Sequence, residues 1–165
     1  MARPGMTRTP VTRPVVGPPG FAATGGRRVR TGSGGDGRAG APAWERNTVR
    51  PGHRFPRHAH ADWSVAVVCG GAGLIDTAGA SHEAPAGAIT VLHPGEPHRS
   101  RAHPGTGLDY LVVTVGRAAA AELYGGPGDP VFTDRVIDDP GCAGALLAAC
   151  EADGRRPGGA APELA

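Results

Sequence analysis

At 165 residues, the chain is long enough for one domain with a single core and too short for two comfortable ones. Its 17 Arg, absence of Lys and 15 acidic residues leave a net charge of +2, which by itself does not indicate nucleic-acid binding. No apolar run approaches the length of a membrane-spanning helix and no apolar secretory segment opens the chain, so we predict a soluble cytoplasmic protein without a membrane partner.

The first 43 residues differ in composition from the rest of the chain. They contain ten Gly, six Pro and seven Arg against one Asp, whereas the remainder carries ten Arg against 14 acidic residues. Such a Pro/Gly content is typical of disorder, and we predict a disordered arm over residues 1–43. The arm either touches phosphate or an acidic surface without sequence specificity, or is a solvated tail; Met6 would also allow a later start.

The three cysteines bear on the compartment and on one class of metal site. Cys69, Cys142 and Cys150 are odd in number and form no Cys-x-x-Cys pair. This pattern favours a reducing compartment and argues against a zinc ribbon.

From Trp44 to Val115 the chain alternates short β segments with Gly, Pro, Asp and His-Pro breaks. Eight short strands imply a sandwich or a barrel. Within 88–92 and 110–115 both alternating faces are largely apolar, so a helix or a partner subunit should cover the outer face of these strands. The predicted strands are 43–50, 54–60, 63–69, 72–77, 80–83, 88–92, 97–101 and 107–115.

After Val115 the pattern changes from strands to helices. Residues 117–124 favour a helix that ends at Gly125-Gly126-Pro127, and a short extended piece follows between Val131 and Ile137. Asp138-Asp139-Pro140 is typical of a helix start, and we predict a second helix to about Glu151.

The second helix carries a predicted apolar stripe. Helical spacing places Cys142, Leu146 and Cys150 on one side, with Leu147 beside them. The stripe, on the helix at 141–151, is either the seam of a homodimer or the face that packs on the protein's own barrel.

Three histidines form the most informative pattern. His58 and His60 are two apart, so on a strand their imidazoles share one face. Pro94-Gly95 predicts a turn that would bring His98 back beside them. Three convergent imidazoles make either a metal site or a polar pocket.

These motifs resemble those of the cupin barrel, and specifically the sensor domain of AraC-type transcription regulators. Gly52, His58-x-His60 and Gly71 follow the first cupin motif, although its Glu is missing and Ser64 or Val65 stands in its place. Pro94-Gly95-x-x-His98 follows the second motif in the shorter form similar to the AraC-type version. The resemblance covers about residues 44–152.

The resemblance implies a mainly β fold with a cupin-type antiparallel β-barrel, also described as a double-stranded β-helix or jelly roll. We expect the barrel at 44–116, one or two short helices in a C-terminal extension at 117–152, and a flexible tail at 153–165. AraC-type regulators continue into two helix-turn-helix units that this sequence lacks, so we expect no direct sequence-specific DNA binding by this chain alone. It is a truncated regulator, an isolated sensor domain or a stand-alone cupin.

The resemblance also implies a set of site residues. His58, His60 and His98 could hold one divalent metal ion, with zinc, nickel, manganese or iron as candidates, or could form a metal-free polar patch. Trp63 and Tyr110 are further candidates for the ligand-binding wall, but Trp63 could equally be core and Tyr110 could lie at a strand edge.

Two functions from different classes follow. The favoured one is a sensor that binds a small-molecule effector and is not an enzyme, because the missing Glu leaves the usual ligand set incomplete. The alternative is a metal-dependent cupin enzyme, a dioxygenase or an isomerase. A nonfunctional fragment is a third interpretation.

Overall fold

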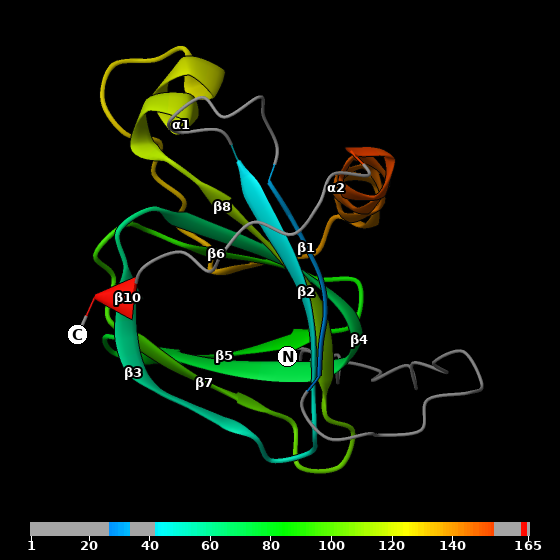
Figure 1. Ribbon diagram of the computed structural model, residues 1–165. Helices are drawn as coiled ribbons and strands as arrows, with labels where there is room; N and C mark the ends of the chain where they lie inside the picture. The colour runs from blue at the N-terminus through cyan, green and yellow to red at the C-terminus, as the bar shows by residue number, and fades with distance from the viewer. Residues whose placement is uncertain (1–26, 34–41, 154–162, 165) are drawn as a thin grey trace, which may run out of the picture.

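The protein is described here by a computed structural model that covers residues 27–33, 42–153 and 163–164 (Figure 1). Strands and helices follow the order expected from the sequence, with strands first and helices after the barrel. The elements are β1 (Arg27–Ser33), β2 (Ala43–Val49), β3 (Arg54–His60), β4 (Trp63–Thr77), β5 (Ala80–Pro85), β6 (Ile89–Leu92), β7 (His98–Ala102), β8 (Leu108–Val115), α1 (Arg117–Tyr124), β9 (Val136–Ile137), α2 (Pro140–Asp153) and β10 (Glu163–Leu164).

All strand pairs are antiparallel, and the strands form one continuous ten-stranded sheet with the central order β1-β2-β8-β4-β7-β3-β10. This sheet folds into two halves that share β4 and face each other, and we call them the first and the second sheet. The pairings give the order β1-β2-β8-β4-β6-β9 in the first and β5-β4-β7-β3-β10 in the second. Figure 1 shows β6 and β8 of the first sheet above β5 and β7 of the second. The predicted mainly β, cupin-type antiparallel barrel is therefore confirmed.

Strand β4 joins the two sheets, and here the predicted boundaries were wrong. The expected strands 63–69 and 72–77 are one 15-residue strand that pairs with β8 and β6 in its first half and with β7 and β5 in its second. The register shifts between Val68 and Gly70, and Gly71 takes a φ of 70°. A bulge with a left-handed glycine bends a strand without ending it, which explains why the glycine pair was mistaken for a break.

The outer face of the first sheet is apolar and is covered by the chain's own helix α2. Val67, Ile89 and Leu111 are each less than 5% exposed, and they belong to clusters that include Ala143 and Cys150 of α2. Of the two covers predicted for these strands, the helix is the one present.

The predicted stripe on α2 needs a correction. Cys142 is exposed, and the buried side instead consists of Ala143 and Cys150, with Leu146 and Leu147 partly buried between them. At about 100° per residue, Cys142 lies about 80° around the helix from Cys150, whereas Ala143 lies about 20° from it and so shares its buried side. Asp139 caps the helix, because its Oδ1 accepts a hydrogen bond from the Cys142 backbone N–H at 2.9 Å.

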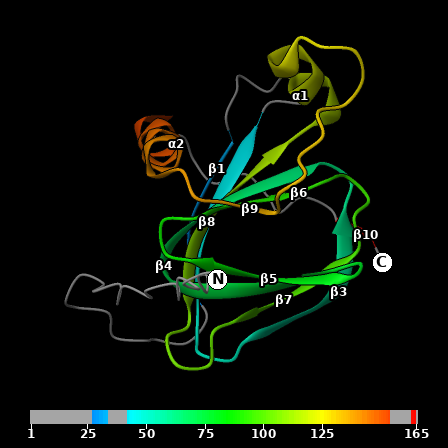
Figure 2. The ribbon, with the colours of Figure 1, turned by 180° about the vertical axis from the view of Figure 1, so that it is seen from behind.

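The rest of the extension follows the prediction closely. Helix α1 spans the expected residues and ends at Gly125, whose φ of 64° allows its N–H to bond the Ala121 carbonyl. Figure 2 shows β9 beside β6 on the way to α2, and the register pairs Ile89 with Ile137. The extension thus adds a strand to the first sheet.

The two ends of the chain contribute one short strand each. Within the predicted arm, Arg27–Ser33 forms β1 on the edge of β2, and within the predicted tail, Glu163–Leu164 forms β10 on β3. An edge strand has unpaired backbone groups that such additions satisfy. The remainder of the arm and tail lies outside the described residues, and the division into arm, barrel, extension and tail stays a prediction. None of the described helices has the length and apolarity needed to span a membrane.

Candidate functional site

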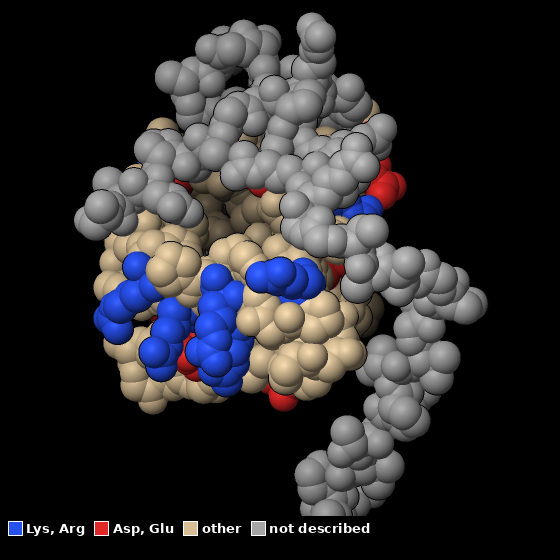
Figure 3. Space-filling view, turned by 60° about the horizontal axis from the view of Figure 1, so that its bottom comes forward, with Lys and Arg blue, Asp and Glu red and all other residues tan. Residues whose placement is uncertain are grey.

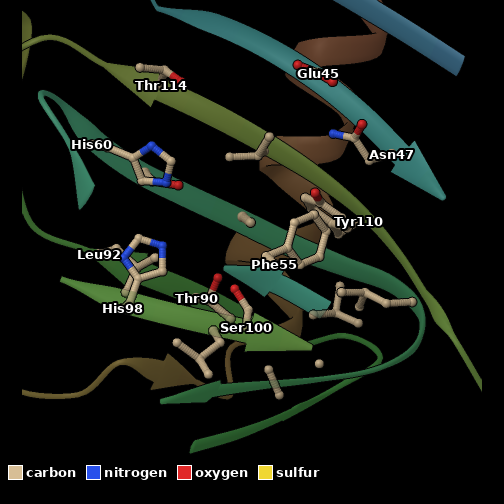
Figure 4. A pocket seen from close by; sticks show the side chains of 18 of the residues that line it. Glu45, Asn47, Phe55, His60, Thr90, Leu92, His98, Ser100, Tyr110 and Thr114 are labelled. Carbon is tan, nitrogen blue, oxygen red and sulfur yellow. The ribbon is translucent and has the colours of Figure 1, made fainter. Parts of the chain in front are cut away.

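The space between the two sheets contains a cavity of about 260 Å³ (Figure 4). More of the accessible wall surface is apolar than polar, although ten of the 19 lining residues carry polar side chains, and concave sites of this mixed character bind small molecules. The polar lining residues are Glu45, Asn47, His58, His60, Ser64, Thr90, His98, Ser100, Tyr110 and Thr114.

The three predicted histidines meet at one end of this cavity. Strand β3 carries His58 and His60, and β7 pairs with it so that His98 lies opposite His58. Ring centroids are 4.8 Å apart for His58 and His60, 4.4 Å for His58 and His98, and 5.1 Å for His60 and His98. One ring nitrogen from each lies within 4.8 Å of the other two. In Figure 4, His60 and His98 project toward the same space.

Backbone carbonyls orient two of the three rings. Nδ1 of His58 lies 2.8 Å from the Pro56 carbonyl oxygen, and Nδ1 of His98 lies 2.9 Å from the Glu96 carbonyl oxygen. A carbonyl oxygen can only accept, so each Nδ1 must donate a proton. The neutral tautomer then leaves the lone pair on Nε2, which is the arrangement that metal-binding histidines use.

The surroundings of His98 favour the neutral form of its imidazole. It is 2% exposed. Burial lowers the pKa of its imidazole and the neighbouring His58 ring lowers it further, although the Glu96 carbonyl acts in the opposite direction. A neutral imidazole is the form that can bind a cation.

The residue that orients His98 also contacts the C-terminal extension. The Glu96 carboxylate accepts a hydrogen bond from Arg135 Nε at 2.8 Å and one from the His93 backbone N–H at 3.0 Å. Its Oε2 also lies 3.1 Å from His93 Nδ1, and His93 Nε2 accepts from the Phe132 backbone N–H at 3.0 Å. Arg135 donates in turn to the Phe132 carbonyl. We call His93, Glu96, Phe132 and Arg135 the Glu96 network.

The Glu96 network depends on an ionised carboxylate. Burial opposes ionisation of Glu96, but the hydrogen bonds from Arg135 and His93 outweigh it and lower the pKa of this carboxyl. Arg135 and Glu96 are both partly buried, at 20% and 15% exposure, so their ion pair is less screened than one on the open surface.

Residues 42–155 match the family model described as the AraC-like ligand binding domain. The chain belongs to this family. No curated protein sequence matches it.

Several solved structures are similar to the AraC-like domain. A protein of unknown function from Rhizobium leguminosarum is 21% identical, over 58% of this chain and 85% of its own, with a TM-score of 0.46. A cupin-2 domain protein from Shewanella frigidimarina is 21% identical, over 45% of this chain and 70% of its own, with a TM-score of 0.40. An oxalate decarboxylase variant from Bacillus subtilis is 16% identical, over 61% of this chain and 34% of its own, with a TM-score of 0.42.

The predicted site residues of the AraC-like domain divide into two groups. His58, His60, His98 and Tyr110 all line the cavity. Trp63 does not, and its assignment to the cavity wall is corrected. Ser64 faces inward, so its neighbour Trp63 points to the outer side, where it is 3% exposed and packs in a cluster with Ala120 of α1.

Several cavity residues were missed from the sequence. Glu45 and Asn47 come from β2, Phe55 from β3, and Thr90 and Ser100 from β6 and β7. Alternation within the predicted strands was the signal that could have found them, because each is two residues from another inward-facing position or opposite one. Nothing in the local sequence marks the Glu96 network, whose partners are 39 residues apart.

The three imidazoles fit a divalent cation. Two of them present Nε2 with a fixed tautomer, and three neutral nitrogens with open positions are a known zinc-type donor set. Among the described residues no carboxylate joins this cluster, although Glu45 lies elsewhere in the wall. The donor set therefore resembles a three-histidine site more than a two-histidine, one-carboxylate iron site.

Proposed function

We propose that this chain is the effector-binding sensor domain of an AraC-type transcription regulator. A small molecule would enter the cavity, contact the histidines and the apolar wall, and change how the C-terminal extension packs on the barrel. The family match and the cavity between the sheets support this proposal.

The single observation that carries the proposal is the position of Glu96. Its backbone carbonyl holds the ring of His98 in the cavity, while its carboxylate holds Arg135 just before β9 and α2. A ligand that moves His98 would therefore act on the same residue that fixes the extension. A sensor needs such a connection between its binding site and a distant element, whereas an enzyme does not.

A divalent cation would be part of this site. His58, His60 and His98 would hold it, and it would supply an open coordination position for an oxygen or nitrogen of the effector. The carbonyls of Pro56 and Glu96 would keep two of the rings aimed at it.

A metal-dependent cupin enzyme, a dioxygenase or an isomerase, remains the second candidate. The convergence of three imidazoles favours it, because an open metal position can polarise a substrate oxygen. The cupin fold serves enzymes and non-enzymes alike, so the fold does not choose between them. We favour the sensor because, among the described lining residues, Glu45 is the only carboxylate and it does not belong to the histidine cluster.

Homodimer formation through α2 stays a prediction. The buried side of the helix contacts its own barrel, so a second copy would have to use the exposed side. That this chain alone does not bind a specific DNA sequence also stays a prediction.

Metal titration and hydrogen exchange together test the sensor proposal. Zinc added to metal-stripped protein should bind stoichiometrically by calorimetry, and His58→Ala should abolish this binding. Zinc should also slow amide exchange in residues 131–150, because it fixes His98 and through it the Glu96 network. Glu96→Gln should still bind zinc, since the three imidazoles remain, but the slowing of exchange should be lost.

The matched control is Asp129→Asn, which breaks the exposed ion pair of Asp129 with Arg117 at 2.8 Å. This variant should keep the full zinc response. If zinc does not bind to the unmodified protein, the metal-site hypothesis is wrong. If zinc binds but amide exchange in residues 131–150 does not change, the histidine site is not coupled to the extension, and the sensor proposal is wrong.

A further inference from the structure

The outer face of the second sheet carries a cluster of arginines. Arg54 and Arg57 lie on β3, and Arg99 and Arg101 lie on the neighbouring β7. Phe55, His58, His98 and Ser100 of the same strands line the cavity, so alternation turns the arginines outward. We call these four residues the arginine face. Figure 3 shows blue side chains gathered on this side of the molecule.

Most of these arginines are not neutralised by a neighbour. Within the described residues, Arg54, Arg57 and Arg101 have no carboxylate at salt-bridge distance. Arg99 is paired with Asp76 at 2.9 Å, and Asp76 also accepts a hydrogen bond from Ser81. Asp76 pairs with Arg99 and also attracts Arg101, but one carboxylate balances only one of the four positive charges, so most of the charge of the face is uncompensated.

Three of the four other arginines in residues 42–153 behave differently, and only Arg50 also lacks a carboxylate at salt-bridge distance. Arg46 binds Asp109 at 2.9 Å, Arg117 binds Asp129 at 2.8 Å, and Arg135 binds Glu96 at 2.8 Å. Residues 42–153 contain eight Arg against 13 acidic residues, so carboxylates are plentiful. Half of these arginines are nevertheless concentrated on two adjacent strands.

The register makes this concentration unfavourable for the isolated domain. Arg54 lies directly opposite Arg101 across the antiparallel pair. Like charges directly opposite each other destabilise a sheet. An anionic group bound between the Arg54 and Arg101 side chains would remove the repulsion between them. The surface should therefore attract an anionic partner.

The character of the surface selects the kind of partner. Stable protein interfaces have an apolar centre in which aromatic, methionine and arginine side chains are buried together. The large exposed hydrophobic residues of the described chain all lie in the C-terminal extension and none on the arginine face; they are Leu123, Tyr124, Val131 and Phe132. The face therefore offers charge and hydrogen-bond donors without an apolar centre, which suits a polyanion.

We propose that the arginine face binds the phosphate backbone of double-stranded DNA without reading its bases. Guanidinium groups bind phosphate oxygens in a bidentate manner. Alternate residues along a strand are about 6.7 Å apart and neighbouring strands about 4.8 Å apart, so the four side chains can reach several phosphates at once. The arginines lie on the broad face of a sheet rather than on a helix or a two-stranded ribbon that could enter the major groove, so the contact is independent of base sequence.

The experiment measures binding of the full chain to a labelled mixed-sequence DNA duplex by fluorescence anisotropy over a series of salt concentrations. The double variant Arg54→Gln/Arg101→Gln should lower the slope of log K against log salt by about 2, one for each lost phosphate contact. The control Arg117→Gln removes one positive charge from an ion pair elsewhere, and its slope should equal that of the unmodified protein.

Three outcomes would overturn the inference. The first is that the unmodified chain fails to bind the duplex at low salt. In the second, the double variant binds like Arg117→Gln while melting at the same temperature as the unmodified protein, which would place the contact in the seven arginines of residues 1–43, present in every variant. The third is that polyglutamate displaces the duplex at equal charge concentration, which would indicate an acidic protein partner. None of these outcomes bears on zinc binding in the cavity, so the sensor proposal is tested separately.

Discussion

The two sheets of the barrel enclose the same cavity but differ on their outer surfaces. The first sheet is apolar outside and lies under α2, whereas the second sheet carries exposed arginines and neither helix covers it. One strand, β4, contributes to both. Its first half is largely buried on both faces and its second half alternates between buried and partly exposed, so the local sequence already records which part is covered.

This difference implies that stability comes mainly from the covered sheet. Truncating a buried side chain lowers the free energy of unfolding, because its burial energy is lost and a cavity is left behind. Truncating an exposed side chain changes the free energy of unfolding little. The site, in contrast, draws its histidines from the second sheet alone. Stability and binding thus depend on different sheets. Substitutions in the first sheet should mainly lower stability, and substitutions of the histidines in the second sheet should mainly lower binding.

The largest expected effect is on the covered sheet. Leu111 is 2% exposed and packs in the cluster with Val113 and Cys150. Leu111→Ala should lower the free energy of unfolding by about 2–5 kcal/mol, measured by urea denaturation. Arg99→Ala is the matched change on the second sheet, where the side chain is 69% exposed, and it should cost no more than about 0.5 kcal/mol. Equal losses would contradict the comparison.

A smaller effect is expected at the junction of the sheets. A Cβ at Gly71 would lie 2.2 Å from the Gly107 carbonyl oxygen, and its φ of 70° disfavours any side chain. Gly71→Ala should therefore cost about 2 kcal/mol or more and broaden the unfolding transition if the sheets separate.

Gly79→Ala is the control for the junction. Gly79 has a φ of 90°, but a Cβ added there would meet no atom within 4 Å, so only the backbone penalty of about 1 kcal/mol should remain. If both variants lose the same free energy of unfolding, the close approach of Gly71 to Gly107 does not contribute to the stability of the junction between the sheets.

The smallest effect concerns the pH dependence of the uncovered sheet. The hydrogen bonds from Ser81 and Arg99 lower the pKa of the Asp76 carboxyl. A depressed pKa means that this carboxylate stabilises the fold above the pKa of the unfolded chain, near 3.8, and that the contribution is lost as the pH falls through the folded value. Asp76→Asn should therefore be slightly less stable than the unmodified protein at pH 7 and equal to it near pH 2, as followed by thermal melting. A difference that persists at pH 2 would point to a cause other than charge.

Local patterns in the sequence predicted most of the fold. Short β segments between Gly, Pro, Asp and His-Pro breaks predicted β2, β3 and β6 to within a residue or two, and Asp138-Asp139-Pro140 predicted the start of α2. What failed depended on distant partners. The glycines of β4 look like a turn until β8 and β7 pair on either side of them, because a bulge and a break have the same local composition.

The candidate site was predictable in its ligands and not in its connections. His58, His60 and His98 followed from strand spacing and the Pro94-Gly95 turn. The side of the sheet on which Trp63 lies could not be predicted, because it depends on the strand register in the assembled sheet. The contact of Glu96 with Arg135 could not be predicted either, because Arg135 lies in a loop without regular structure. Such long-range polar contacts have no periodic signature in a single sequence.

The location of Trp63 gives the protein a built-in optical probe. Its ring lies 4.5 Å from His93 and 5.7 Å from Phe132, both of which belong to the Glu96 network. Opening of that network would hydrate the indole and shift its emission to longer wavelength. With Trp44→Phe removing the second of the two tryptophans, a fluorimeter alone could follow effector arrival in real time, without attaching any dye.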